Sequence, residues 1–383
     1  MLRFAEYIWI DGADDEKPVQ TLRSKGKVVE VTEIAWEAFS MSQSPVTQFP
    51  ALSGINWFPA NLPVVNEWNF DGSSTKQAKG GDSERLLMPV RTVPDPLREG
   101  SFLVLCEVLN PDGTPHESNQ RAKLTNILNE KTGHSADSLE SLWGFEQEYC
   151  FMDKATDNIL GWPATQRFFP KPQGEFYCGV GCDEVVGRDI AYEHADACIK
   201  AGLLYYGHNA EVMLGQWEFQ IGHRGFDGDY KADALVASDH LWLARYLLYR
   251  IGEKHNVYAT LTPKPIAGDW NGSGMHTNFS DKFTRDKIGG RIRIMAIREA
   301  MEKTHFEHQK LYGHGNKARL SGRHETAPYE KFSMGQADRG ASIRIPNKTQ
   351  QDGYGYLEDR RPAANADPYV VTNRILKTLL TCG

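Results

Sequence analysis

The residues best suited to chemistry are glutamates placed inside segments that look like β-strands. In GFEQEYCFM (residues 144–152), Glu146 and Glu148 are two positions apart, so on a strand both carboxylates leave the same face. Two neighbouring carboxylates repel each other, and such a pair needs a raised pKa or a bound cation. Alternating glutamates are more often a solvated strand face, so the segment by itself leaves both interpretations open.

A second pair of glutamates, Glu211 and Glu218, belongs to the strand-like segment EVMLGQWEFQIG (residues 211–222). A spacing of seven would put their side chains on opposite faces of a straight strand. Gly215 lies between them, and a bulge or bend there would restore a common face. Aromatic and polar residues alternate after it, so the polar face must meet water or ions. An amphipathic edge strand is the alternative.

A histidine and a fifth glutamate extend this set. In GMHTNFS (residues 274–280), His276 shares a strand face with Asn278 and Ser280, and the preceding glycines let the backbone approach a ligand closely. A single histidine is more often structural than a ligand. Glu358 lies in GYLEDRRP, beside two arginines.

Taken together, these side chains favour a site for two divalent cations. Ligation by carboxylates with at most one imidazole suits Mg²⁺ or Mn²⁺ better than Zn²⁺ or copper. Two such ions would leave about one negative charge uncompensated, which would attract a further cation such as ammonium. The candidate metal ligands are Glu146, Glu148, Glu211, Glu218, His276 and Glu358.

The stretch 316–346 carries the opposite charge, in arginines that could face these carboxylates. The planar guanidinium matches carboxylate and phosphate oxygens in two-point contacts, whereas surface salt bridges are the ordinary alternative. Glu325, in the loop-like HETAP, fits a lid residue better than a packing residue. The arginines are Arg319, Arg323, Arg339 and Arg344, followed by Arg360.

The elements that must position these residues indicate an α+β protein of two domains. β-Branched and aromatic runs predict strands at 7–10, 27–34 and 102–109, with residues 40–66 as loop. The turn signal NPDGTP ends the first part, which gives domains of residues 1–115 and 116–383. In the second, strands 144–152, 211–222, 274–280 and 341–346 alternate with helices expected at 189–206, 230–255, 291–311 and 367–380.

Composition fits a globular protein outside membranes. The 383 residues carry a formal net charge of −7, with 40% hydrophobic and 24% charged residues. No basic stripe indicates a nucleic-acid partner, and no apolar run approaches the ~20 residues of a membrane span. Six scattered cysteines are too sparse for a disulfide scaffold, and the N-terminus has no signal-peptide design. We therefore expect a cytoplasmic protein.

Several long motifs, in order along about 300 residues, give the chain a specific family resemblance. It resembles glutamine synthetases of the type II, eukaryotic-like class. The motifs are WNFDGSST (68–75), GFEQEY (144–149), NAEVMLGQWEFQIG (209–222), DWNGSGMHTNFS (269–280), RLSGRHET (319–326), RGASIRIP (339–346) and GYLEDRRPAANADPY (355–369).

The resemblance implies an N-terminal β-grasp domain and a larger catalytic domain with a curved antiparallel sheet flanked by helices. It implies ATP-dependent ligation of ammonia to the side-chain carboxylate of L-glutamate, through a γ-glutamyl phosphate intermediate. Two or more Mg²⁺ or Mn²⁺ ions would be the cofactors. The family also forms double-ring homo-oligomers, here a decamer, with active sites between subunits.

The resemblance also assigns roles to individual positions. One metal would take Glu148, Glu211 and Glu218, and the second Glu146, His276 and Glu358. The positions matching glutamate contacts are Trp270, Asn271, Gly272, Arg319, Arg339 and Arg360. The catalytic residues would be Asp71, which reaches the neighbouring subunit's site and takes the ammonium proton, the flap residue Glu325, and Arg339.

The positions matching ATP contacts include metal ligands and arginines as well as neutral residues. They are Glu146, Glu218, Phe219, Gln220, Ile221, Gly222, His223, Asn278, Phe279, Ser280, Arg339, Arg344, Tyr356, Leu357 and Glu358. Two alternatives stay open: a related ligase that joins glutamate to another amine, and a ring-forming relative without catalysis. Retention of Asp71, Glu325 and all six metal ligands favours glutamine formation.

Overall fold

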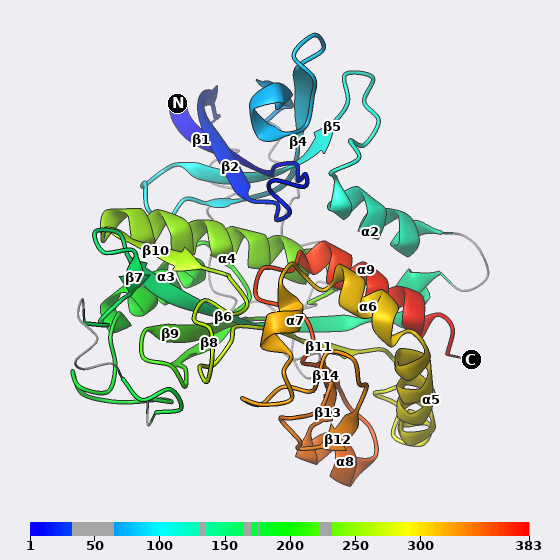
Figure 1. The fold of residues 1–383 in the computed structure, drawn as a ribbon. Coiled ribbons are helices and arrows are strands. Elements are labelled where there is room, and N and C mark those ends of the chain that lie inside the picture. The colour runs from blue at the N-terminus through cyan, green and yellow to red at the C-terminus, as the bar shows by residue number, and fades with distance from the viewer. Residues whose placement is uncertain (33–64, 131–134, 164–169, 175, 223–231, 383) are drawn as a thin grey trace, which may run out of the picture. The chain divides into compact units, whose positions relative to one another are not determined.

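The computed structural model describes residues 1–32, 65–130, 135–163, 170–174, 176–222 and 232–382 (Figure 1). The chain divides into two compact units. One consists of Met1–Ala122 with Ile199–Gly202, and the other of Lys123–Cys198 with Leu203–Gly383. The boundary predicted between residues 115 and 116 stays a prediction.

The first unit is built on a five-stranded mixed sheet with the order β2-β1-β5-β4-β3. Its central strands β1 and β5 run parallel, and the other neighbours are antiparallel. Tyr7, Trp9 and Phe102 contribute to the core on one face. Residues 33–64, between β2 and β3, lie outside the described residues, so the β-grasp stays a prediction. The bounds are β1 Leu2–Ile10, β2 Leu22–Glu30, β3 Trp68–Asp71, β4 Glu84–Pro94 and β5 Phe102–Leu109.

The second unit holds a curved sheet that, among the described residues, has nine strands. Seven follow the order β12-β13-β14-β11-β6-β9-β8, and β7 and β10 pair with β6. Its neighbours are antiparallel except β12 and β13, which confirms the expected catalytic-domain fold class. The bounds are β6 Leu142–Asp153, β7 Asn158–Ile159, β8 Tyr205–Ala210, β9 Gln216–Ile221, β10 Val257–Thr260, β11 Met275–Ser280, β12 Met334–Gln336, β13 Ile343–Ile345 and β14 Leu357–Asp359.

Helices flank this sheet (Figure 1). The long, largely buried helix α4 packs on β6, β9 and β10 and against α9. Asp367 caps the N-terminus of α9 by accepting from the Tyr369 amide. The bounds are α2 Gln120–Asn129, α3 Arg188–Lys200, α4 Ala234–Lys254, α5 Gly290–Lys303, α6 His305–Leu311, α7 Asn316–Arg319, α8 Asn347–Asp352 and α9 Pro368–Leu379.

Two expected helices differ from the observed ones. The helix expected over 189–206 is wrong at its end, because Gly202 takes a left-handed conformation and β8 follows directly. The helix expected over 291–311 is two helices, α5 and α6, separated at Thr304. The Thr304 hydroxyl bonds the Ala300 carbonyl within the last turn of α5, a local bond that competes with helix continuation.

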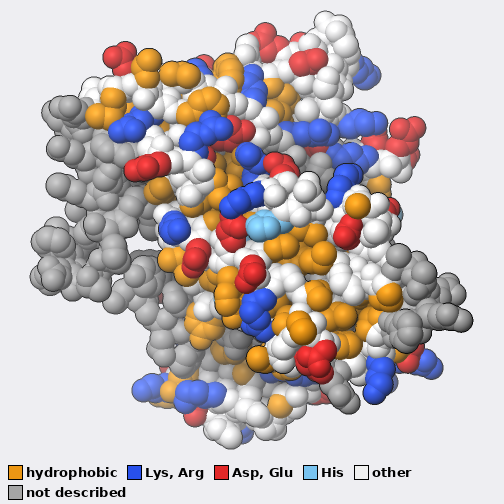
Figure 2. Space-filling view, turned by 90° about the vertical axis from the view of Figure 1, so that its left-hand side faces the viewer, with side chains coloured by type: hydrophobic (Ala, Val, Ile, Leu, Met, Phe, Trp, Pro, Cys, Tyr) orange, Lys and Arg blue, Asp and Glu red, His pale blue; other side chains and the backbone are white. Residues whose placement is uncertain are grey.

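Charged side chains of both signs are interspersed on the described part of the face in Figure 2. Among the described residues, no helix has both the length and the apolar character that a membrane crossing requires.

Candidate active site

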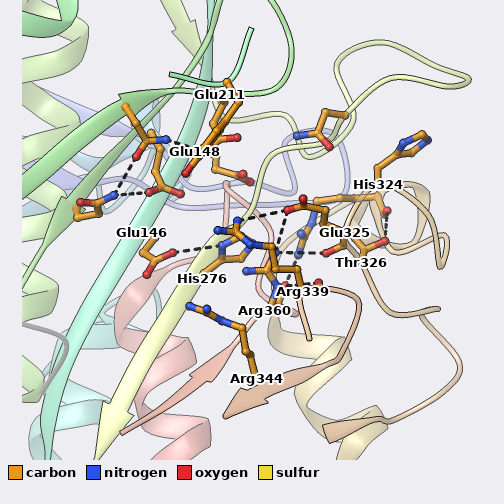
Figure 3. Close-up of a pocket in the computed structure, with 17 residues that line it drawn as sticks. Glu146, Glu148, Glu211, His276, His324, Glu325, Thr326, Arg339, Arg344 and Arg360 are labelled. Atoms are coloured by element: carbon orange, nitrogen blue, oxygen red, sulfur yellow. Dashed lines mark hydrogen bonds and ion pairs between the residues drawn. The ribbon is translucent and has the colours of Figure 1, made fainter. Parts of the chain in front are cut away.

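A polar cavity of about 190 Å³ lies in the second unit, with carboxylates on one side and arginines on the other (Figure 3). Strands β6, β9 and β11 contribute Glu146, Glu148, Glu218 and His276, and the turn between β8 and β9 contributes Glu211. The residues around 319–344 and the end of β14 contribute the basic ones. The lining consists of Glu146, Glu148, Tyr177, Asn209, Glu211, Glu218, Gln220, Asn271, Gly272, His276, Arg319, His324, Glu325, Thr326, Arg339, Arg344 and Arg360.

The central strand β6 places Glu146 and Glu148 on this cavity, as their spacing predicts. In the antiparallel register Glu148 lies opposite Glu218 of β9, and Glu146 lies opposite His276 of β11. Side chains at directly opposed positions share a face of the sheet. Pairing of three strands therefore brings four side chains together from distant parts of the sequence.

Glu211 reaches the same cavity by a different route from the one expected. It does not share a strand with Glu218, because β8 ends at Ala210 and β9 begins at Gln216. The connection is a turn in which Gly215 has φ = +87° and the Glu211 amide donates to the Gln216 carbonyl at 2.9 Å. A hairpin at the glycine, rather than a bulge within one strand, brings the two carboxylates together.

The acidic side chains form two groups with the spacing of metal ligands. Glu148, Glu211 and Glu218 offer oxygens within 4.8 Å of one another, and so do the ligand atoms of Glu146, Glu218 and His276. The first group is the trio assigned to one metal from the sequence. In the second group Glu218 stands where Glu358 was expected.

Burial acts strongly on the first group. It raises the pKa of Glu148 to about 7 and, with help from the charge of Glu148, raises the pKa of Glu211 to about 8. Burial and the neighbouring carboxylates also raise the pKa of Glu218 well above its usual range. A divalent cation would remove this penalty by balancing the charge, so the donor set fits such an ion.

His276 gives an independent indication of a missing partner. Its Nδ1 is buried without a hydrogen-bond partner among the described residues, and lies 3.7 Å from oxygens of both Glu146 and Glu358. Burial, followed by the charge of Arg360, lowers the pKa of His276 well below its usual range. A neutral imidazole nitrogen with no proton donor beside it is suited to a metal.

Glu358 is close to this group but is occupied by cations of the protein. It accepts from Arg344 and, at 2.7 Å, from Nη1 of Arg360. Its role as a ligand stays a prediction, because binding a metal would require it to share or exchange these partners.

Arg319 and Arg360 are buried arginines at the cavity wall. Arg319 donates to the carbonyls of Arg360, Arg361 and Pro362 at 2.8–2.9 Å. Burial lowers the pKa of Arg319 to about 10, so it stays charged at neutral pH. These bonds fix the guanidinium groups in place, where they can meet an anionic substrate without reorganisation.

The loop carrying Glu325 closes part of the cavity (Figure 3). Glu325 lies 3.5 Å from Arg339 and 3.9 Å from Arg360. His324 and Glu325 both have positive φ values, +55° and +60°. Two consecutive non-glycine residues in this region store backbone strain, which is typical of functional loops.

Several predicted nucleotide and substrate positions direct their side chains elsewhere. Phe219, Ile221, Phe279 and Leu357 are fully buried and do not line the cavity. Trp270 packs against Trp162 with the two rings tilted at 45° and their centroids 4.5 Å apart. Any contact of these residues with a ligand would involve backbone atoms, and their roles stay predictions.

The remaining neutral positions lie around the cavity or near it. Asn271, Gly272 and Gln220 line it, and their substrate and nucleotide contacts stay predictions. Asn278 donates to Glu146 at 2.9 Å and Ser280 accepts from Arg285 at 2.7 Å. The last two positions predicted to contact ATP are Gly222, whose φ is +86°, and Tyr356, whose carbonyl accepts from Thr349.

Two predicted residues cannot be compared with this cavity. Asp71 belongs to the first unit, where its carboxylate caps the short 3₁₀ turn Gly72–Thr75 by accepting from the Ser73 amide at 3.0 Å. His223 lies outside the described residues. Both roles stay predictions.

Four lining residues were missed from the sequence: Tyr177, Asn209, His324 and Thr326. Asn209 donates to Glu211 at 2.9 Å and so orients that carboxylate. His324 precedes Glu325 and approaches Asp269 at 3.2 Å. Position in the sequence could have indicated three of these residues, because Asn209 lies two positions before Glu211 and because His324 and Thr326 adjoin Glu325. The sequence carried no such indication for Tyr177.

A cavity that opposes buried carboxylates to fixed arginines defines a site for divalent cations and anionic substrates. Comparison with known proteins identifies its family. Residues 120–286 match the model of the glutamine synthetase catalytic domain. A chloroplastic glutamine synthetase of Chlamydomonas reinhardtii is 47% identical over 379 residues, covering 98% of this chain and 90% of the relative.

Two further relatives are similar over nearly their whole length. The glutamine synthetase of Streptomyces viridochromogenes is 47% identical, with 98% of this chain and 96% of the relative covered. A cytosolic isozyme of Pinus sylvestris is 43% identical, with 98% and 93% covered. The chain belongs to the glutamine synthetase family, and the resemblance seen in its motifs is confirmed.

Proposed function

We propose that this protein joins ammonia to the side-chain carboxylate of L-glutamate, using ATP, and releases L-glutamine, ADP and phosphate. Membership of the glutamine synthetase family supports the activity. In this structure the proposal is supported by the cavity, in which three buried carboxylates with raised pKa values face four arginines.

The acidic side of the cavity would hold two or more Mg²⁺ or Mn²⁺ ions. Glu148, Glu211 and Glu218 would bind one, and Glu146, His276 and either Glu218 or Glu358 another. When bound, such ions neutralise phosphate oxygens and help align the transferred phosphoryl group. The carboxylates keep the ions close to the arginines that receive the substrates.

The arginines would bind and orient the two anionic substrates. Arg319 and Arg360, fixed by backbone carbonyls, suit the carboxylates of glutamate, as do the adjacent Asn271 and Gly272. Arg339 and Arg344 are more exposed and suit the transferred phosphoryl group. A carboxylate is a poor electrophile, so phosphorylation to γ-glutamyl phosphate supplies the leaving group that ammonia displaces.

The loop of Glu325 would exclude water from this acyl phosphate, which water would hydrolyse. Its negative charge favours ammonium over neutral competitors. Asp71 would take the ammonium proton, after being brought to the site of a neighbouring subunit in a double-ring homo-oligomer, here a decamer. We further propose a cytoplasmic location, although one relative named above is chloroplastic and another cytosolic.

The decisive experiment measures ADP release in a coupled assay with ATP and Mg²⁺, with and without glutamate and ammonium. The proposal requires release that depends on both substrates and forms glutamine in equal amount. Release that depends on glutamate and a primary amine, but not on ammonium, would identify a different ligase. Absence of release with every amine would mean that the fold is retained without catalysis.

A further inference from the structure

The flap loop, residues 321–328, is closed at its base. Ser321 and Pro328 form an isolated β-bridge across it. Just after the loop, the Tyr329 carbonyl lies 2.9 Å from Nε2 of His305, a buried side chain at the start of α6. The base of the flap loop is therefore attached to the packed part of the second unit.

The tip of the flap loop has an unfavourable backbone conformation. His324 and Glu325 follow each other with φ values of +55° and +60°. For residues other than glycine this conformation costs free energy, and it persists only where surrounding contacts impose it. The contacts made by the tip therefore determine how firmly Glu325 is held at the cavity.

On one side, the tip is held by arginines that the substrates also need. The Glu325 carboxylate lies 3.5 Å from Arg339, in a pair that is half exposed. Arg360 lies 3.9 Å from the same carboxylate and donates to the Glu325 carbonyl at 3.3 Å. In the proposed function both arginines bind substrate anions, so they must divide their hydrogen bonds between Glu325 and the substrates.

On the other side, the tip is held by His324. Its Nε2 lies 3.2 Å from Oδ1 of Asp269. The His324 side chain is 10% exposed, whereas the Asp269 side chain is 68% exposed. The proposed function gives neither residue a substrate to bind, so this contact can last while the arginines change partners.

Asp269 belongs to a segment that is itself fixed. The Lys264 ammonium group donates to the Trp270 carbonyl, next to Asp269. Three residues beyond Asp269, the Gly272 carbonyl accepts from Gln216 of β9 at 2.8 Å. The contact with His324 therefore connects the tip of the flap loop to the segment that lines the glutamate side of the cavity.

We propose that His324 is a positioning residue, whose contact with Asp269 holds the flap loop over the cavity while the arginines bind substrates. The inference rests on the proposed function, in which this loop keeps water from the acyl phosphate. With the loop held, ammonia displaces phosphate from γ-glutamyl phosphate and glutamine forms. With the loop released, water attacks the same carbonyl and gives back glutamate and phosphate. ATP is spent in both cases, so the ratio of glutamine to ADP reports the contact.

Direct proton transfer by His324 is the competing interpretation, since this residue lines the cavity. In Figure 3 its imidazole is turned away from the acidic side of the cavity. Burial, followed by the charge of Lys264, lowers the pKa of His324. At neutral pH a neutral imidazole therefore faces the Asp269 carboxylate, and a neutral N–H donor is enough for the contact. The geometry favours positioning.

The first test measures ADP and glutamine together, with ATP, Mg²⁺, glutamate and ammonium. We expect the wild type to form the two in equal amounts. His324→Ala and Asp269→Ala should each release several times more ADP than glutamine. His324→Gln should restore the ratio, because its amide reaches Asp269 as a neutral donor. The control is His255→Ala, whose imidazole lies 2.7 Å from Glu193 in a pair outside the cavity lining.

Two results of this test would overturn the proposal. One is equal amounts of ADP and glutamine in both alanine variants. The other is loss of all ADP release in His324→Ala and in His324→Gln, with Asp269→Ala unchanged. That pattern would assign a direct chemical role to the imidazole.

The second test uses no substrate. Hydrogen exchange of the whole protein is followed in peptides that cover the flap loop. His324→Ala and Asp269→Ala should each speed exchange there about fivefold, the effect of one partly exposed pair on an equilibrium. The double variant should exchange no faster than either single variant. Exchange unchanged from the wild type would exclude the contact. A wild type that forms no glutamine would refute the proposed function, and this measurement would still decide whether His324 holds the loop.

Discussion

Two sets of buried carboxylates in the second unit differ in what balances their charge. Asp281 is paired with Arg293, and Asp359 with Arg361, each at 2.7 Å. Tyr312 also donates to Asp359 at 2.8 Å. In contrast, Glu148, Glu211 and Glu218 have no salt bridge within the described part of the chain.

The difference separates side chains that stabilise the fold from side chains whose charge the protein leaves for a ligand to balance. A buried ion pair with further hydrogen bonds is satisfied by the protein itself. The cavity carboxylates keep an electrostatic penalty, visible in their raised pKa values, that only a cation or a proton relieves. At the end of β14 both carboxylates belong to the satisfied kind, since Glu358 is paired with Arg344 and Arg360 and Asp359 with Arg361.

The largest effect is expected from Glu218→Gln, because Glu218 belongs to both ligand groups. We expect a loss of glutamine formation of about 1000-fold, equivalent to about 4 kcal/mol, together with loss of Mn²⁺ binding measured by electron paramagnetic resonance. The control is Glu330→Gln, an exposed glutamate paired with Lys317. Unchanged Mn²⁺ binding in the Glu218→Gln variant would contradict the assignment of Glu218 to both ligand groups.

Removing one partner of the satisfied pair should instead affect stability. Asp359→Asn leaves the buried Arg361 uncompensated, so we expect the free energy of unfolding to fall by about 3–5 kcal/mol. In the same metal-free buffer, Glu218→Gln should leave stability unchanged or raise it. Urea unfolding measures both, with Glu253→Gln at an exposed pair as control. If both substitutions lowered the free energy of unfolding equally, the cavity carboxylates would not differ from the paired ones in the way described.

The pH dependence of the metal-free protein should reveal the unsatisfied set. Glu148 and Glu211 have folded pKa values of about 7 and about 8, above the ordinary 4.5. Between pH 4.5 and these raised pKa values, the folded state therefore binds more protons than the unfolded state. The stability of the folded state should fall as the pH rises from about 5 to about 8. Because one unit of pKa shift corresponds to about 1.4 kcal/mol, the two carboxylates together set an expected loss of several kcal/mol.

Saturating Mn²⁺ should remove this fall, because the cation replaces the protons. The double variant Glu148→Gln, Glu211→Gln should remove it without metal. A metal-free wild type whose thermal midpoint rises over the same pH range would contradict the assigned direction of the pKa shifts.

The smallest effect is expected from Asn209→Ala. Asn209 orients Glu211 and also accepts from Gln220 at 3.2 Å. Loss of such a supporting bond should weaken Mn²⁺ binding about tenfold. Asn373→Ala is a control, since the Asn373 side chain donates to the Lys123 carbonyl at an exposed position. An unchanged Mn²⁺ affinity would mean that Glu211 needs no support.

Local pattern was enough to locate most of the site. The two-residue spacing of Glu146 and Glu148 predicted a common face, and β6 confirms it. The strand 102–109 has the predicted bounds. The route of Glu211 was beyond such reasoning, because a glycine can mark either a bulge or a turn. The packing of the downstream strand, not the glycine, decides between the two.

The sequence by itself determined the family, the acidic and basic character of the site, and the alternation that directs each side chain to one face of a strand. These follow from residue type and from the two-residue period of a strand. Only the tertiary structure decided that Glu218 joins both ligand groups and that Glu358 is held by arginines. Each of these depends on which distant segments lie together, because burial and charge balance are properties of the assembled neighbours.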